Sequence, residues 1–299
     1  MEEDKHSHEF NSSINIRLAF LLNLAFTILE IIGGFWTNST AILSDALHDL
    51  GDSLSLGLSW FLENYSQKEP DQKFTFGYSR FSLLGALLNS FILIGGSIFV
   101  LSEATPRLFN PQVIKPREML LFSIGGIIIN GIAAYKLKHG ESLNEKVVSW
   151  HLLEDVLGWI AIFIVSIVVL FYEIHVLDPI LSILITIYVL YNVIKNLRSI
   201  LTVFLQGIPI GLSVKELELK IINNTEIKSI HHTHLWTLEG EKNLLSTHIV
   251  VEDEIDKLKI IQIKKNIRKL MKKEGIEHVT IEVEYQMEYC SNKECQKNF

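Results

Sequence analysis

Two segments of the sequence repeat one arrangement of metal-ligating side chains. His48 is followed four residues later by Asp52, and His151 is followed four residues later by Asp155. Residues four apart on an α-helix share one face, about one turn from each other. Each pair therefore offers a nitrogen and a carboxylate oxygen from one helix, and two facing helices would offer four ligands. That donor set in fourfold coordination suits Zn²⁺.

Both pairs lie in long apolar stretches of a chain that is 48% hydrophobic and has a mean hydropathy of +0.28. Six stretches reach the roughly 20 residues that span a bilayer. They are residues 14–36, 40–62, 81–103, 118–138, 146–171 and 177–201. Ionisable groups at membrane depth are costly and mark functional sites, and a satisfied core hydrogen bond explains a repeated His-Asp pair poorly. We expect the polar residues of these stretches to face the bundle interior, namely Asn23, Glu30, Asp45, His48, Asp52, Asn89, Asn130, His151 and Asp155.

Two further carboxylates lie close to the first pair. Asp45 comes three residues before His48, on nearly the same helical face, and Glu30 lies in the preceding span. Each could act as an outer-shell partner of a ligand or as an acid on a proton path. The alternative for Asp45 is a carboxylate that stabilises the start of its own helix, which we place near Thr40. Glu30 has the same ambiguity.

The distribution of charge divides the chain. Charged residues are sparse through the first two thirds and dense after Lys215, which predicts a membrane domain followed by a soluble one. The net charge of -7 comes with no basic patch, which argues against a nucleic-acid partner. The N-terminus lacks a secretory signal, and Cys290 and Cys295 imply no disulfide framework. Lys and Arg are more frequent in the loops after the second and fourth spans, so we expect both termini in the cytoplasm.

After Pro209 the pattern becomes that of a small α+β domain. We expect helices at 213–224 and 255–273, the latter ending at Gly275, and strands at 228–237, 243–251 and 278–285. The predicted fold is an all-α membrane domain of six transmembrane helices followed by a cytoplasmic αββαβ domain. The predicted boundaries are a tail at 1–13, a transport domain at 14–208, a soluble domain at 209–288 and a tail at 289–299.

Histidines gather on the predicted strands of the soluble domain. They are His231, His232 and His234 on the first strand, His248 on the second and His278 at the start of the third. Alternate residues share a strand face, so we expect His232 and His234 to point together, opposite His231. We expect some of the five to bind metal. The alternative is a set of ordinary surface and core histidines.

Several motifs resemble one family in combination. They are Glu30-Ile-Ile-Gly-Gly, the run from Ser39 to Asp52, the loop from Pro70 to Arg80, His151 to Asp155 and Asp178-Pro179-Ile180. Together they resemble the zinc-type branch of the cation diffusion facilitator family, over nearly the whole chain. The resemblance implies a homodimeric six-helix transporter in a lipid bilayer, with a cytoplasmic ferredoxin-like domain, that exports metal as protons enter. It implies that His48, Asp52, His151 and Asp155 are the transport ligands and that Zn²⁺ is the substrate, with Cd²⁺ and Co²⁺ as further candidates.

The resemblance also implies a regulatory zinc ion at the soluble domains, and it selects His231, His234, His248 and His278. Two departures from the family are informative. Some members have a second zinc site in the loop after the second helix, but here Phe74 and Tyr78 replace its histidines beside Asp71, so we expect no such site. The long His-rich loop before the fifth helix is missing, which favours a bacterial-type protein of the inner membrane.

Three other functions compete with proton-coupled zinc export. An intramembrane metalloenzyme would keep an open coordination position, and the sequence lacks an HExxH or nucleophile motif. A metal-ion channel without proton coupling would need weaker oxygen ligands. A membrane-anchored metal sensor is the third alternative. We favour the antiporter in zinc homeostasis, because metal and protons compete for the same ligands and one site can exchange them.

Overall fold

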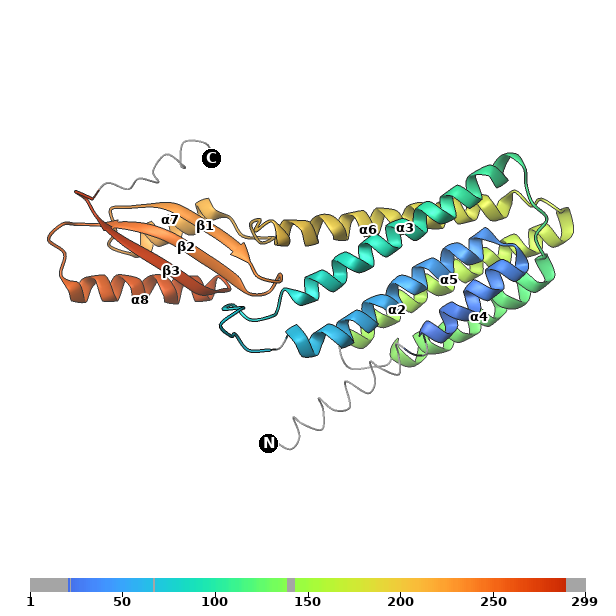
Figure 1. The fold of residues 1–299 in the computed structure, drawn as a ribbon, viewed down its shortest axis with the longest axis horizontal. Coiled ribbons are helices and arrows are strands. Elements are labelled where there is room, and N and C mark those ends of the chain that lie inside the picture. The colour runs from blue at the N-terminus through green and yellow to red at the C-terminus, as the bar shows by residue number, and fades with distance from the viewer. Residues whose placement is uncertain (1–20, 22, 67, 139–142, 289–299) are drawn as a thin grey trace, which may run out of the picture. The chain divides into compact units, whose positions relative to one another are not determined.

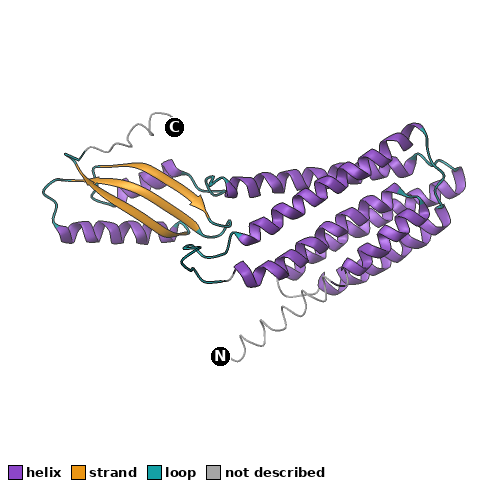
Figure 2. Cartoon of the chain, in the orientation of Figure 1, coloured by secondary structure: helices purple, strands orange, loops and turns teal. Residues whose placement is uncertain are grey.

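The computed structural model describes residues 21, 23–66, 68–138 and 143–288 (Figure 1). They form two compact units. One comprises the chain up to Asn64 together with Leu84–Leu197, and the other comprises Tyr65–Leu83 together with the chain from Arg198 onward. The first unit is helical, and the second contains a three-stranded sheet (Figure 2). The loop between the second and third helices thus belongs to the same unit as the sheet.

The helical unit follows the predicted order of apolar stretches. A helix at Asn23–Thr37 is followed by α2 (Thr40–Ser66), α3 (Phe81–Phe109), α4 (Pro116–Lys138), α5 (Leu143–Tyr172) and α6 (Leu177–Phe204). Among the described residues, α3 to α6 contain segments that are long and apolar enough to cross a membrane. The helix at Asn23–Thr37 is shorter in the described part of the chain, and α2 carries several acidic residues and a histidine. Four of the six predicted spans are therefore supported by length and composition.

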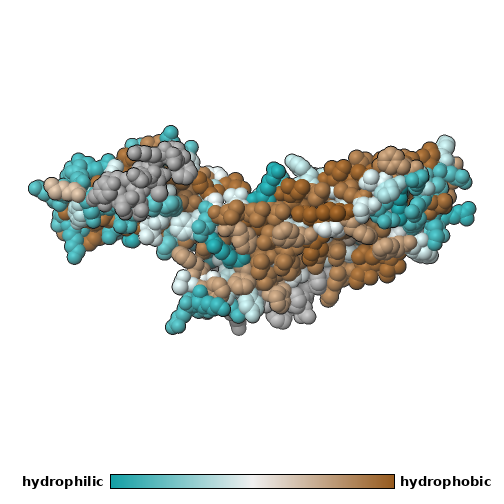
Figure 3. Space-filling model, turned by 45° about the horizontal axis from the view of Figure 1, so that its top comes forward, coloured by the Kyte–Doolittle hydropathy of each residue, from teal (hydrophilic) through white to brown (hydrophobic). Residues whose placement is uncertain are grey.

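The surface of the helical unit is apolar along its helices (Figure 3). Large side chains point outward from α3, α5 and α6, for example Phe99, Leu157 and Leu184, and each is more than half exposed. Such a surface is unfavourable in water and suits contact with lipid chains.

Five of the nine polar side chains predicted to face the bundle interior are buried, while Asn23, His48 and Asp52 are half-buried and the side chain of His151 lies outside the described part of the chain. The buried ones include Glu30, Asp45, Asn89, Asn130 and Asp155. Burial of these groups away from lipid is expected because an uncompensated polar group in hydrocarbon is costly. The interior of the bundle is therefore the place to look for a site.

Helices α4 and α5 approach each other closely at a glycine. The side chain of Trp159 on α5 is 1% exposed and lies against Gly126 of α4. A Cβ atom at Gly126 would come within 2.2 Å of the indole ring. The absence of a side chain at this position lets α5 carry Trp159, four residues after Asp155, against its neighbour.

The soluble sheet has the predicted element order. Helix α7 (Val214–Asn224) precedes β1 (Ser229–Thr237) and β2 (Asn243–Val251), and α8 (Lys257–Lys273) precedes β3 (Ile276–Tyr285). The strand order is β1-β2-β3, with β1 antiparallel and β3 parallel to β2. The predicted end of α8 is confirmed, because Gly275 follows its last turn with a φ of 76°.

One face of the sheet packs on the two helices. Leu245 and Ile249 of β2 form a core with Ile221 of α7 and Ile267 of α8. Neighbouring residues on a strand point to opposite faces. His248 therefore lies on the other face, where its register partners are His231 on β1 and Glu282 on β3.

Candidate functional site

The membrane helices bring three of the four predicted ligands together. The Nε2 atom of His48 lies 3.9 Å from Oδ2 of Asp52 on the same helix and 3.9 Å from Oδ1 of Asp155 on α5. Asp155 is 7% exposed, whereas His48 and Asp52 are 28% and 34% exposed. His151 lies on α5 one turn before Asp155, but its side chain is outside the described part of the chain.

The two contacts of His48 approach the spacing of ligands around one metal ion, but the ligand atoms of His48, Asp52 and Asp155 do not all lie within 4.8 Å of one another. Zinc bonds of about 2.0–2.2 Å in a tetrahedron place ligand atoms about 3.3–3.6 Å apart. The two distances of 3.9 Å therefore need a contraction of roughly half an ångström to enclose a zinc ion. A mixed nitrogen and oxygen donor set held by two helices can bind Zn²⁺ or, when empty, take up protons.

Asp45 and Glu30 are buried beside this cluster. Asp45 is 5% exposed and its Oδ1 atom lies 3.3 Å from the position that a Cβ atom on Gly158 of α5 would take. Glu30 is 1% exposed and lies within electrostatic reach of Asp45 and Asp155. Both carboxylates are thus near the predicted ligands, as their positions in the sequence suggested.

One acidic residue of this region escaped the sequence analysis. Asp49 is 4% exposed, lies near Glu30, and its backbone carbonyl accepts a hydrogen bond of 3.3 Å from Asn23 Nδ2. The signal that could have revealed it is its spacing from Asp45, which is the same four residues that join His48 to Asp52. Several carboxylates therefore share the interior with the three ligands.

A second cluster lies on the face of the sheet away from the helices. His248 Nδ1 is 2.7 Å from Glu284 Oε1, and His231 Nε2 is 3.2 Å from Glu284 Oε2. Each residue offers a ligand atom, and these three atoms lie within 4.8 Å of one another. All three residues are buried, and Glu282 approaches the other nitrogen of His248 at 3.2 Å. Two imidazoles and a carboxylate are a donor set that fits zinc.

A bulge in β1 changes which histidines share a face. The pairing with β2 shifts between His231 and His234, and His232 takes a φ of 49°. His232 and His234 do point together, with their Nε2 atoms 3.2 Å apart. His231 is not opposite to them as expected, because both His231 and His232 contact the ring of His248. Desolvation, and then the neighbouring charge of His234, lower the pKa of His232, which favours its neutral, metal-binding form.

His278 lies elsewhere in the sheet. It pairs with Leu244, four residues from His248 along β2, and its ring contacts Phe76 at a centroid distance of 5.7 Å. The structure therefore does not bring His278 to the cluster. The acidic partners Glu282 and Glu284, which the sequence analysis missed, lie at the cluster end of the same strand.

The loop between α2 and α3 is held by hydrogen bonds around Asp71. This carboxylate accepts bonds from the hydroxyl of Tyr78 at 2.6 Å and from the amides of Lys73 and Phe74 at 2.8 and 2.7 Å. The bond from Tyr78 is the main reason that the pKa of Asp71 is lowered. Phe74 packs on Tyr78 with ring centroids 4.7 Å apart. The two positions at which the resemblance called for zinc ligands thus build a hydrogen-bonded aromatic loop.

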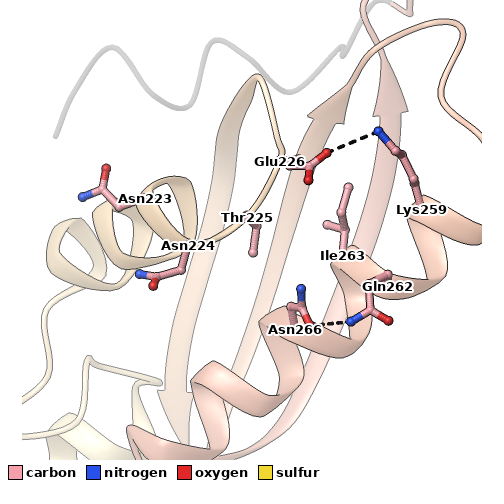
Figure 4. A pocket seen from close by; sticks show the side chains of 8 residues that line it. All are labelled: Asn223, Asn224, Thr225, Glu226, Lys259, Gln262, Ile263 and Asn266. Atoms are coloured by element: carbon pink, nitrogen blue, oxygen red, sulfur yellow. Dashed lines mark hydrogen bonds and ion pairs between the residues drawn. The ribbon is translucent and has the colours of Figure 1, made fainter.

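A cavity of about 290 Å³ lies between the end of α7 and α8 (Figure 4). Its wall includes an ion pair of 3.5 Å between Glu226 and Lys259 and an amide hydrogen bond of 2.8 Å between Gln262 and Asn266. None of the histidines discussed above lines it. The cavity is therefore separate from the metal-ligating clusters.

The cation efflux transmembrane domain matches residues 16–205 of the chain. The chain belongs to the cation diffusion facilitators. A "Zinc transporter ZitB" of Pectobacterium atrosepticum is 35% identical over 97% of this cation diffusion facilitator and 91% of its own length. The "Cadmium, cobalt and zinc/H(+)-K(+) antiporter" of Bacillus subtilis is 34% identical over 93% of this chain and 91% of its own.

A third relative, the "Metal cation efflux system protein CzcD" of Cupriavidus metallidurans, is 32% identical over 93% of this cation diffusion facilitator and 89% of its own length. These relatives support the assignment of this chain to the zinc-type branch of the family, and the family consists of transporters. A solved structure, the "Metal-bound C-terminal domain of the CzcD transporter", is 28% identical, with a TM-score of 0.22, over 24% of this chain and 99% of its own.

Proposed function

We propose that the protein is a proton-coupled antiporter that exports Zn²⁺ from the cytoplasm in exchange for H⁺. The observation that carries this proposal is the convergence of His48, Asp52 and Asp155 from two helices inside an apolar bundle. His151 supplies the fourth ligand, one turn from Asp155 on the same helix. Cd²⁺ and Co²⁺ are further candidate substrates, because two relatives carry these metals or metal cations in their names.

Proton coupling follows from the chemistry of the ligand set. Carboxylates and imidazoles must be deprotonated to hold a metal, and inside an apolar bundle they are neutralised by protons when the metal leaves. Movement of the helices exposes the site to each side in turn. Asp45 and Glu30 serve as outer-shell partners of the ligands or as acids on the proton path, since both are buried next to the cluster.

The assembly proposed around this site has three parts. Six helices cross the inner membrane with both termini in the cytoplasm, the ferredoxin-like soluble domain joins two chains in a homodimer, and zinc binds that domain as a regulator. The regulatory site consists of His231, His248 and Glu284, with His232 and His234 beside it. Its support is the approach of three buried donors to within 4.8 Å.

Alanine variants of the transport ligands test the proposal. We expect His48→Ala, Asp52→Ala, His151→Ala and Asp155→Ala each to abolish zinc transport in proteoliposomes while the protein stays folded. The matched control is Glu154→Ala, which removes an exposed carboxylate next to Asp155 on the same helix. Normal transport by folded Asp52→Ala or Asp155→Ala would reject this site. Zinc flux that saturates but carries no protons would favour the channel or a uniporter, and zinc binding without flux would favour the sensor.

A further inference from the structure

The start of α2 is hydrogen-bonded to Asp178 of α6. Asp178, in the first turn of α6, is fully buried, and its Oδ2 atom accepts hydrogen bonds from the amide of Thr40 at 2.7 Å and from its hydroxyl at 2.9 Å. Its Oδ1 atom accepts bonds from the Ser39 hydroxyl and from the amide of Ala41 at 3.4 Å. One carboxylate therefore receives four hydrogen bonds from the first turn of the helix that carries His48 and Asp52.

These bonds complete the N-terminal cap of α2. The amides of the first turn have no partner within a helix, and they must be satisfied from outside it. Asp178 binds the first two, and the amides of Ile42 and Leu43 donate to the hydroxyl and the carbonyl of Ser39 at 3.2 and 3.4 Å. The first turn of α2 contains no acidic residue of its own. The negative charge that favours a helix N-terminus therefore comes from α6.

Hydroxyl groups continue this contact along the two helices. Ser182 Oγ donates to the carbonyl of Thr40 at 2.9 Å, and Ser44 Oγ lies 2.7 Å from Thr186 Oγ1. The hydroxyl of Ser44 also reaches the carbonyl of Ser182 at 3.3 Å. All four of these residues are at most 1% exposed. We call the row formed by Asp178, Ser182 and Thr186 against Thr40 and Ser44 the polar seam.

The polar seam lies on α2 before the proposed transport ligands. Its α2 members are four residues apart, and the same spacing leads next to His48 and then to Asp52. Each step of four residues advances the helix by about 6 Å and turns it by about 40°, so His48 lies about 12 Å along α2 and about 80° around its axis from Thr40. The bonds to α6 hold α2 in one rotation about its axis, and that rotation also directs the neighbouring face, which carries His48 and Asp52, toward Asp155 on α5.

We propose that Asp178 is a positioning residue of the transport site, which sets the zinc affinity by holding α2 in the rotation that aligns His48 and Asp52. The proposal rests on the proposed transport function. Without Asp178, the start of α2 loses its N-terminal cap and its hydrogen bonds to α6. The distances from the zinc ion to His48, Asp52, His151 and Asp155 then become less uniform. A small ion with short bonds is affected more than a larger ion such as Cd²⁺.

The test measures zinc and cadmium transport by full-length protein in proteoliposomes, together with zinc affinity in detergent. The affinity measurement uses a His231→Ala/His248→Ala background, which disables the soluble cluster. We expect Asp178→Ala to raise the KM for zinc about tenfold or more, as for residues that orient metal ligands, and to lower the preference for zinc over cadmium. Asp178→Asn keeps the shape of the side chain and one of its two acceptor oxygens. Its KM for zinc is therefore expected to lie between those of the unmodified protein and Asp178→Ala.

The control is Ser166→Ala, which removes a buried hydroxyl of α5 that donates to the carbonyl of Ile162 on its own helix at 2.7 Å. Its KM and metal preference are expected to match those of the unmodified protein. Wild-type KM and metal preference in Asp178→Ala, with only a lower melting temperature, would overturn the proposal. If that variant fails to fold, unchanged values in both Asp178→Asn and Ser182→Ala overturn it. His48→Ala in the same assay separates the two claims, since normal transport by that variant would reject the transport site itself.

Discussion

At the scale of single residues, we expect the nitrogen of His48 to affect metal preference most directly, because it is the nitrogen donor beside Asp52 and Asp155. Replacing it by a carboxylate in His48→Asp changes the ligand set from mixed nitrogen and oxygen toward oxygen. Harder oxygen ligands favour Mn²⁺ and Fe²⁺ relative to zinc. We expect competition assays on purified protein to show this shift, and His278→Asp, at an exposed histidine that belongs to neither cluster, to leave the preference unchanged. An unchanged preference in His48→Asp would locate selectivity outside the ligand set.

His232 gives the soluble domain a defined response to pH. Its pKa is lowered from the ordinary value of 6.5, mainly by desolvation. As the pH falls through 6.5, the unfolded chain takes up the proton before the folded chain does, so the contribution of His232 to stability is present above the unfolded pKa and is lost as the pH falls toward the lower pKa of the folded state. In metal-free protein we expect His232→Ala to weaken this decrease in thermal melts between pH 7.5 and 5.5. A decrease of the same size in the variant would assign it to other groups.

Residue types and spacing were enough to predict that Asp52 and Asp155 approach His48, because the period of a helix puts residues four apart near one face. The same spacing of four residues joins Asp45 to Asp49, so it would also have predicted that Asp49 lies in the bundle interior near Asp45. The soluble site was harder to predict. Glu284 reaches His248 through the parallel pairing of β3 with β2, and the register of that pairing is not encoded in either strand alone. The bulge at His232 was also not predictable, and it places His231 on the same side as His232, beside His248, instead of on the opposite face.

At the scale of elements, the contact between α4 and α5 positions Asp155. Gly126 leaves room for Trp159, and Gly126→Ala would place a methyl group 2.2 Å from the indole. Overpacking of this kind costs about 1–3 kcal/mol and shifts the backbone. Because Asp155 lies one turn from Trp159, we expect zinc transport to fall together with the melting temperature.

The adjacent Gly125 provides a matched control for this contact. A Cβ atom there would meet no atom within 4 Å, so Gly125→Ala should leave transport unchanged. Equal effects of the two substitutions would show that helix flexibility, and not the contact with Trp159, is what the glycines provide.

The elements themselves were largely predictable. Apolar stretches gave the helices to within a few residues, and alternation with turn residues gave the strands of the soluble domain. Two features differ from the prediction. Helix α3 continues through Pro106 to Phe109, beyond the predicted end at 103. The loop after α2 belongs to the soluble unit, where Arg80 Nε donates to the Leu238 carbonyl at 3.1 Å, a long-range contact without a local signal.

At the scale of the whole molecule, the central claim is that one site holds either zinc or protons. The ligands His48, Asp52 and Asp155 can be loaded with metal from the less acidic cytoplasm. Protons from the more acidic exterior then displace that metal. Net transport therefore needs both species at the same site, and a pH gradient alone should drive zinc against its own gradient.

The most direct test is zinc flux in proteoliposomes under an imposed pH gradient, with internal zinc and pH recorded in the same vesicles. The account predicts zinc movement against its concentration gradient, opposite proton movement elicited by zinc, and the loss of both in Asp155→Ala, whereas Glu154→Ala retains them. Zinc flux that is independent of the pH gradient and moves no protons would contradict antiport.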